Sequence, residues 1–164
     1  MRKCKEKIFC FISKMSTATK VTKQSIDLTE DQMKALVKNL TDRKIHVYPN
    51  SPSPCWRSHL KPNKKSGYVQ VTVGLGERNK RMKPYAHRVM ASHAKKKYTY
   101  CAHIFNTNDA SHRCGNKWCI NPDHQVLETG PYNQTRDCCR MFLHKREGYT
   151  CPHEPCCIVH NSNE

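Results

Sequence analysis

A short segment, SHRCGNKWCINPDHQVLETGPYNQTRDCC, restricts what this chain can fold into more than any other. It runs from Ser111 to Cys139 and holds four cysteines and two histidines. Thiols and imidazoles at such close spacing bind metal ions, and thiols also form disulfides. Only 37% of the 164 residues are hydrophobic, which leaves a core too thin to be stable without cross-links of this kind. We therefore expect a small hydrophobic core in a fold that cysteines and histidines fasten together.

The choice between disulfides and metal sites depends on the compartment. The N-terminal apolar run, Ile8–Ile12, has five residues with lysines on both sides. It is too short for a signal sequence or a membrane span, so we expect a reducing, intracellular environment and no membrane association. Thiols grouped with histidines bind zinc in such an environment. The odd number of cysteines, 11, agrees with this interpretation.

The chain is strongly basic. A formal net charge of +16 predicts polyanionic partners, most often nucleic acid. The basic residues are spread along the chain, which indicates a broad binding surface rather than a charged tail. A solvated basic face or ribosome-type RNA binding is the alternative, because charge alone does not separate DNA from RNA.

Three segments have the pattern of helices. Thr29 and Gln32 form a capping box, and the apolar residues that follow, Met33 to Leu40, recur at i, i+3, i+4 and i+7. The sequence of residues 84–93 predicts a second, short helix. Residues 131–143 predict a third, which begins at a proline, a residue tolerated at the first helical position.

Two segments have the pattern of strands. Residues 67–73 alternate strictly, with three valines on one face, and residues 98–104 alternate again. An antiparallel ribbon of this kind, flanked by basic residues, can lie in the major groove of DNA and read base edges with its polar face. A plain surface strand would have the same pattern. If the ribbon does bind DNA, its polar face and the basic run after it supply the contacts: Tyr68, Gln70, Thr72, Arg78, Lys80 and Arg81.

The first group of metal ligands is Cys114-x4-Cys119-x4-His124. Three soft ligands at these spacings can surround one tetrahedral zinc ion, and a structural site needs a fourth. We expect Cys55, which stands alone in a proline-rich loop before the ribbon, to be the fourth ligand. Cys101 is the second choice.

The second group is Cys151-x-His153-x3-Cys157, which also lacks a fourth ligand. Cys139, within the predicted helix 131–143, completes it, and the neighbouring Cys138 and Cys156 are then bystanders. Four protein ligands leave no open position on the metal, so both zinc ions are expected to be structural. Buried cysteines without a metal are the alternative.

Two residues in this region are not needed for zinc. His112 precedes the first cluster by two residues, and Asn133 lies in the first turn of the predicted helix 131–143. Each has a plain alternative: His112 as a surface residue or as a zinc ligand in place of His124, and Asn133 as a helix-terminal residue bonded to its own backbone. The order of elements is a strand with His, a loop with metal ligands, and a helix with Asn.

The combined pattern, Ser-His-x-Cys-x4-Cys-x-Asn-Pro-x-His-x8-Asn-x2-Arg followed by Cys and then Cys-x-His-x3-Cys, resembles the His-Cys box of intron-encoded homing endonucleases. These belong to the ββα-metal, or His-Me finger, nucleases related to the HNH enzymes. The resemblance covers residues 111–157, and the spacing of the ligands agrees there with the spacing of the catalytic residues. Upstream it is loose.

The resemblance implies a role for each matching residue. His112 would be the general base that takes a proton from the attacking water. Asn133 would hold one Mg²⁺ through its side-chain oxygen, and this ion would stabilise the charge that develops on the leaving oxygen. An arginine near the scissile phosphate would come from the ribbon, with Arg78 as the candidate and Arg81 the next. Each of the two clusters described above would hold one zinc ion.

The expected fold is therefore α+β, a zinc-stapled ββα-metal nuclease core with an antiparallel β-ribbon. Residues 1–24 would form a basic, poorly ordered arm. Residues 25–164 would form one domain, with a DNA-binding part at 44–104 and a catalytic part at 105–160.

The expected activity is a Mg²⁺-dependent, site-specific double-strand break in double-stranded DNA. A homodimer would act on a pseudo-palindromic site. The protein would act in the nucleus if a nuclear ribosomal-DNA intron encodes it, and otherwise elsewhere in the cell. The two rival functions are a zinc-stapled nucleic-acid-binding protein without catalysis and a non-specific HNH-type nuclease.

Overall fold

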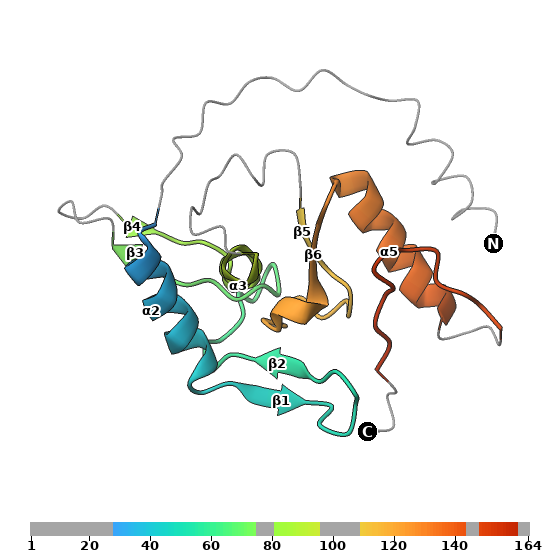
Figure 1. Cartoon of the computed structure of the whole chain (residues 1–164), viewed down its shortest axis with the longest axis horizontal. Coiled ribbons are helices and arrows are strands. Elements are labelled where there is room, and N and C mark those ends of the chain that lie inside the picture. Colours follow the sequence, from blue (N-terminus) through green and yellow to red (C-terminus); the bar gives the residue numbers. More distant parts are fainter. Residues whose placement is uncertain (1–27, 75–80, 96–108, 144–147, 161–164) are drawn as a thin grey trace, which may run out of the picture.

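The computed structural model describes residues 28–74, 81–95, 109–143 and 148–160. In this part of the chain, helices are combined with three separate two-stranded antiparallel sheets (Figure 1). The helix–sheet mixture agrees with the predicted α+β class. In chain order the elements are α2 (Glu30–Thr41), β1 (Ile45–Val47), β2 (Cys55–Arg57), β3 (Val73–Gly74), β4 (Arg81–Met82), α3 (Ala86–Ala94), β5 (Asp109–His112), η1 (Pro122–His124), β6 (Gln125–Glu128) and α5 (Gly130–Leu143).

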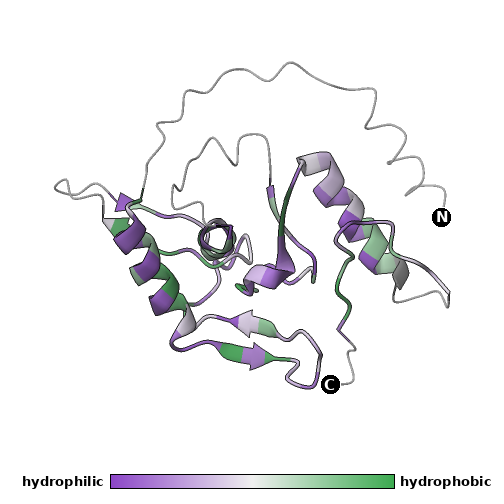
Figure 2. Ribbon diagram, in the orientation of Figure 1, coloured by the Kyte–Doolittle hydropathy of each residue, from purple (hydrophilic) through white to green (hydrophobic). Residues whose placement is uncertain are grey.

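Helix α2 begins at the predicted capping box. The Thr29 hydroxyl accepts a hydrogen bond from the Gln32 backbone N–H at 3.2 Å, and the Gln32 side chain accepts one from the Thr29 N–H at 2.9 Å. Met33 and Leu40 are fully buried. Polar residues occupy the other side of the helix (Figure 2). The predicted amphipathic helix is confirmed.

The predicted ribbon is an antiparallel hairpin whose two arms are mostly irregular in hydrogen bonding. β3 and β4 pair over two residues each, and the pairing continues through the bonds Val71 N–H to Pro84 O (3.0 Å) and Ala86 N–H to Val69 O (2.9 Å). The three valines of this segment are buried and Thr72 is exposed, as the alternation predicted. Regular strand in the ribbon is nevertheless confined to the two residues of β3 and the two of β4.

One hydrophobic core lies between α2, the ribbon and α3. Its fully or largely buried members are Leu28, Met33, Leu40, Val69, Val71, Val73, Ala86, Val89, Met90 and Ile120. Of the described side chains, no member of this cluster follows Ile120, so the C-terminal third of the chain depends on other interactions. The small hydrophobic core expected from the composition is confirmed.

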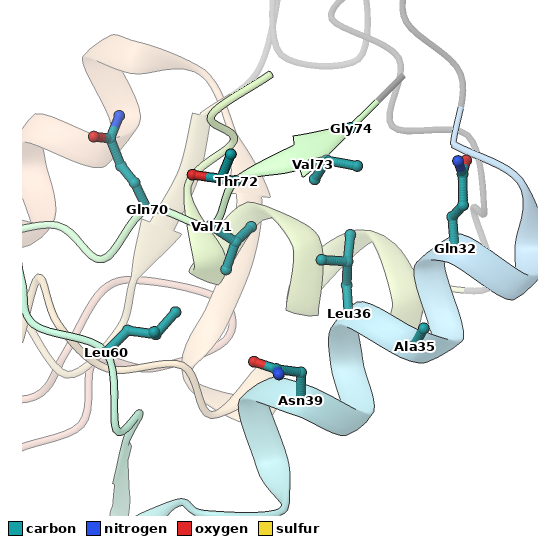
Figure 3. Close-up of a pocket in the computed structure, with 10 residues that line it drawn as sticks. All are labelled: Gln32, Ala35, Leu36, Asn39, Leu60, Gln70, Val71, Thr72, Val73 and Gly74. Carbon is teal, nitrogen blue, oxygen red and sulfur yellow. The ribbon is translucent and has the colours of Figure 1, made fainter. Parts of the chain in front are cut away.

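A cleft opens between α2 and the ribbon (Figure 3). Leu36 of α2 packs against the core that includes Val71 and Val73, and the rim carries polar groups such as Asn39 and Thr72. The cleft therefore lies between α2 and the outer edge of the ribbon. The hydrophobic core beneath it is continuous.

Strands β1 and β2 form a hairpin that the sequence did not predict. β2 continues onto the loop of the first ligand group, because Arg57 bridges Cys119 and the Ile120 N–H donates to the Trp56 carbonyl at 2.9 Å. This pairing brings the segment around Cys55 to a loop more than sixty residues away in sequence.

Strands β5 and β6 pair in register from Asp109 with Glu128 to His112 with Gln125, and α5 follows at once. Arg136 of α5 is completely buried and its Nε lies 2.8 and 2.9 Å from the two Glu128 carboxylate oxygens. This ion pair attaches α5 to the end of β6. The predicted helix 131–143 is confirmed, with one more residue at its start.

Several predictions fall outside the described residues. These are the arm 1–24, the strand 98–104, Cys101, Arg78 and Lys80. No helix among the described residues is both long enough and apolar enough to span a membrane.

Candidate metal centres and active site

The structure brings together the four side chains predicted for the first cluster. Cys55 comes from β2, Cys114 and Cys119 from the loop after β5, and His124 from η1. Their ligand atoms all lie within 4.8 Å of one another, and all four residues are buried. Hydrogen bonds from the Cys114 and Cys119 thiols lower the pKa of Cys55, which favours a thiolate there.

The spacing of these atoms fits zinc. Zinc–sulfur bonds of about 2.3 Å and zinc–nitrogen bonds of about 2.0 Å at tetrahedral angles place sulfur and nitrogen roughly 3.5 Å apart. His124 Nδ1 lies 3.5 Å from the sulfur of Cys55 and 3.5 Å from that of Cys119. The donor set and its dimensions therefore match a closed structural site.

The second predicted cluster is also assembled. Cys139 of α5 meets Cys151, His153 and Cys157 of the C-terminal segment, again with ligand atoms within 4.8 Å of one another. His153 Nδ1 lies 3.6 and 3.7 Å from the sulfurs of Cys151 and Cys157. The expected bystanders, Cys138 and Cys156, are outside the group.

Both ligand histidines are held by a hydroxyl on the far side of the ring. His124 Nε2 lies 2.8 Å from Ser53 Oγ, and His153 Nε2 lies 2.8 Å from Thr135 Oγ1. The Thr135 hydroxyl already donates to the Tyr132 carbonyl, so it accepts the proton on His153 Nε2 and leaves Nδ1 free for metal. Such outer hydrogen bonds orient metal ligands. Sequence reasoning missed both hydroxyls, since no spacing rule points to them.

His112, the last residue of β5, is buried and lies outside both ligand groups. Its Nε2 donates to the backbone carbonyl of Cys119 at 3.0 Å. Gln125 Nε2 donates to the same carbonyl at 3.2 Å. With its proton on Nε2, the ring has an unprotonated Nδ1. Burial, together with the nearby Arg140 charge, lowers the pKa of His112 to about 4, so the free protein carries a neutral imidazole at neutral pH.

A group of rings surrounds His112. The ring of His87, on α3, lies 4.5 Å from that of His112, and Tyr68 lies 5.8 Å from it. Burial lowers the pKa of His87 well below its usual value and raises that of Tyr68. Sequence reasoning assigned Tyr68 to the DNA-facing side of the ribbon and missed His87. The sequence signal that could have identified His87 is its position in α3, at the spacing of the buried residues of that helix.

Asn133 lies beside β5. Its Oδ1 accepts a hydrogen bond from the Ser111 hydroxyl at 2.5 Å, and its Nδ2 donates to Asp109 Oδ2 at 3.4 Å. Ser111 is the residue directly before His112, so one strand carries both the candidate base and the groups that orient the candidate metal ligand. The surrounding donor set consists of oxygen atoms, which suits a hard cation such as Mg²⁺.

Two arginines bear on the prediction of an arginine in the ribbon. Arg81 lies in β4 and is exposed, as are the basic residues Lys61, Lys64, Lys65 and Lys83. Arg88 on α3 lies nearer the candidate site, with its Nη2 3.7 Å from Asp109 Oδ1. The sequence analysis did not single out Arg88, because an arginine within a helix carries no local signal.

A comparison with known protein families identifies the kind of protein to which these metal-ligand groups belong. A family described as the zinc-binding loop region of homing endonuclease matches residues 54–164, which is more than half of the chain. The chain belongs to this homing endonuclease family. The matched region contains all eight ligands, His112 and Asn133. Neither the curated proteins nor the solved structures that were searched gave a match.

Family membership identifies zinc as the metal that the two ligand groups bind. The homing endonuclease loop is a zinc-binding loop, and each group supplies three cysteines and one histidine at the spacing that zinc requires. Membership also indicates a nuclease that binds DNA. The expected resemblance is thus confirmed at the level of the family.

Proposed function

We propose that this protein is a site-specific, Mg²⁺-dependent endonuclease that hydrolyses phosphodiester bonds of double-stranded DNA. The observation that carries the proposal is the position of His112. A zinc ligand, Cys119, fixes its ring through the backbone carbonyl, while Nδ1 makes no hydrogen bond to any of the described residues. A general base needs one ring nitrogen that is free to take a proton, and Nδ1 of His112 meets this requirement.

The rest of the proposed site follows the order β5, β6 and α5, which is the order of a ββα-metal nuclease core. Asn133 on α5 would hold the Mg²⁺ through Oδ1, with the Ser111 hydroxyl fixing the direction of the carboxamide. When bound, Mg²⁺ supplies charge stabilisation at the scissile phosphate and at the oxygen that leaves. The Asp109 carboxylate, near the Asn133 amide, adds a negative charge that favours a cation there.

In the proposed reaction, His112 Nδ1 takes one proton from a water molecule as the water oxygen bonds to phosphorus. The bond between phosphorus and the 3′ oxygen then breaks, and this oxygen takes a proton from solvent. The low pKa of His112 keeps its ring neutral and able to accept a proton at neutral pH, and the negative charge of a bound phosphate would favour the imidazolium that forms when it does so.

The ribbon is proposed to recognise DNA. Its valines are buried against α2 and α3, while Gln70 and Thr72, which alternate with them, line the open cleft beside α2. Exposed lysines and Arg81 lie at both ends of this segment and can contact phosphates. A homodimer would place two ribbons and two active sites on a pseudo-palindromic target and cut both strands.

The experiment that tests the proposal exposes a plasmid library of genomic inserts to the zinc-loaded protein with and without Mg²⁺, and sequences the new DNA ends. Ends at few positions, formed only with Mg²⁺, are the expected result. Ends spread over all inserts would show a non-specific nuclease. DNA binding without any cut would show a binding protein without catalysis.

A further inference from the structure

The C-terminal segment carries a histidine that neither the zinc-ligand spacing nor the proposed reaction uses. After Cys157 of the second cluster, the chain runs back to the first: the Ile158 N–H donates to the Arg113 carbonyl at 3.0 Å. Ile158 also packs against the cysteines of the first cluster. Two residues after Ile158, His160 Nε2 lies 3.2 Å from the sulfur of Cys55.

His160 contacts the first cluster from outside its ligand sphere. Of the four ligands, its ring nitrogens are hydrogen-bonded to the Cys55 sulfur alone, and its ring lies 5.7 Å from that of His124. His160 is also not among the residues whose donor atoms all lie within 4.8 Å of one another. We infer that His160 is an outer-sphere hydrogen-bond donor to the Cys55 thiolate, and that this bond slows the loss of zinc from the first site.

The charge of the site gives the reason. Zinc with three thiolates and one neutral imidazole carries a net charge of −1, and Cys55, Cys119 and His124 have no exposed surface. A buried negative charge is stabilised by N–H donors aimed at it. Asn116 Nδ2 donates to the Cys55 sulfur at 3.2 Å, so His160 is the second donor to the same atom.

The tautomer of His160 agrees with this assignment. Its Nδ1 is buried and has no hydrogen-bond partner among the described residues. If the proton is on Nε2, where the sulfur accepts it, the buried Nδ1 is a bare acceptor and no N–H group is left unpaired. The opposite tautomer would bury an unpaired N–H, which costs more free energy.

The ring is also held in place by its neighbour. His160 stacks on Tyr48, with the ring centroids 4.5 Å apart and the planes 10° from parallel. Tyr48 has φ of 62°, in the left-handed region that non-glycine residues rarely adopt. Such a conformation persists where the surroundings determine it, and here Tyr48 packs against the first cluster.

The experiment separates the hydrogen bond from the ring stacking. His160→Phe keeps an aromatic ring on Tyr48 and removes the N–H, whereas His160→Gln keeps an N–H donor and removes the ring. Zinc release from the full, zinc-loaded chain is followed with a chromogenic chelator. We expect His160→Phe to release one of its two zinc ions at least about 10-fold faster than the parent, and His160→Gln to release it slowly.

Thiol labelling during release identifies the site that opens. With N-ethylmaleimide and peptide mapping, the cysteines of the first cluster in His160→Phe should be labelled before those of the second. His59→Phe, at an exposed position after β2, is the matched control and should behave like the parent. None of these measurements needs DNA cleavage, so their outcome is independent of the proposed nuclease activity.

Three results would overturn the inference. Slow release by His160→Phe with fast release by His160→Gln would assign the effect to ring packing. Equal acceleration at both clusters would assign it to general loss of stability. Isolation of His160→Gln, which keeps the N–H donor, with one zinc ion instead of two would make His160 a metal ligand.

Discussion

The backbone carbonyl of Cys119 accepts a hydrogen bond from Nε2 of His112 at 3.0 Å. One residue thus has two roles: its sulfur belongs to the first metal cluster, and its carbonyl orients the ring proposed to act as general base. The backbone of a predicted zinc ligand therefore determines which nitrogen of His112 is available for the proposed reaction. A single peptide group links the first metal cluster to the proposed active site.

Loss of either zinc site should destabilise the protein. Cys119→Ser and Cys151→Ser each remove one ligand, and because metal binding contributes directly to folding in a small core, the loss should be on the order of several kcal/mol. Thermal unfolding measured with and without a zinc chelator checks this. Cys156→Ser, at an exposed cysteine outside both clusters, is the control. An unfolding midpoint for Cys119→Ser equal to that of the control would contradict the role of the first cluster.

Asn133→Ala should abolish DNA cleavage while leaving DNA binding and zinc content near those of the parent. The side chain is half-buried and, of the described residues, bonds to two polar groups of β5, so its removal should cost the proposed Mg²⁺ ligand and little of the fold. Cleavage rate, gel-shift affinity and zinc content are measured together. Asn50→Ala, in an exposed loop, should cleave normally. If Asn133→Ala fails to fold, the assignment of Asn133 as metal ligand is wrong.

Removing one partner of the buried ion pair between Arg136 and Glu128 should destabilise the protein far more than removing one partner of the exposed Lys38–Asp42 pair, although the exposed pair is the shorter of the two. Removing one partner leaves an uncompensated buried charge, so Glu128→Ala should lower the free energy of unfolding by about 3–5 kcal/mol. The Lys38–Asp42 pair, at 2.6 Å, has both side chains more than half exposed. Asp42→Ala should cost less than about 1 kcal/mol, apart from any change at the end of α2. Denaturant unfolding of the two variants checks the comparison, and equal losses would contradict it.

Substitutions in the ribbon should separate reading of bases from attraction to phosphates. Arg81→Ala should weaken binding to every DNA sequence and reduce the slope of affinity against salt by roughly one counterion. Gln70→Ala should leave that slope unchanged and relax the preference for one position of the target by about 1–3 kcal/mol. Binding isotherms at several salt concentrations, on the target and on single-base variants, distinguish the two. An unchanged preference in Gln70→Ala would remove the ribbon from base recognition.

The spacing of residues in the sequence predicted those groupings whose members lie within a few residues of one another. The ligands Cys114, Cys119 and His124 follow one another through a turn and η1, so their grouping depends on little else. The capping box at Thr29 and the proline at the start of α5 likewise act over one helical turn. Cys55, although distant, was identifiable because few isolated cysteines were available to complete the set.

Contacts between distant segments were not predictable in the same way. His87 reaches His112 because α3 packs against β5, and His160 reaches Cys55 because the C-terminal segment returns past Arg113. Ser53 and Thr135 bond to the ligand histidines from separate elements. Neither single residues nor their spacing indicates such pairs, since tertiary packing alone brings them together. The three-residue strands β1 and β2 were missed because strands so short show no alternation.

The most direct test of the central claim is the single-turnover cleavage rate of His112→Ala on a target identified from the plasmid library. Within the part of the chain that the structure describes, the His112 side chain makes one hydrogen bond, to Cys119, so the variant should keep both zinc ions and its affinity for DNA. The account predicts that cleavage falls by at least about 100-fold, the usual contribution of a general base, while His59→Ala cleaves like the parent. Cleavage by His112→Ala at the parent rate, with zinc and DNA bound, would contradict the account.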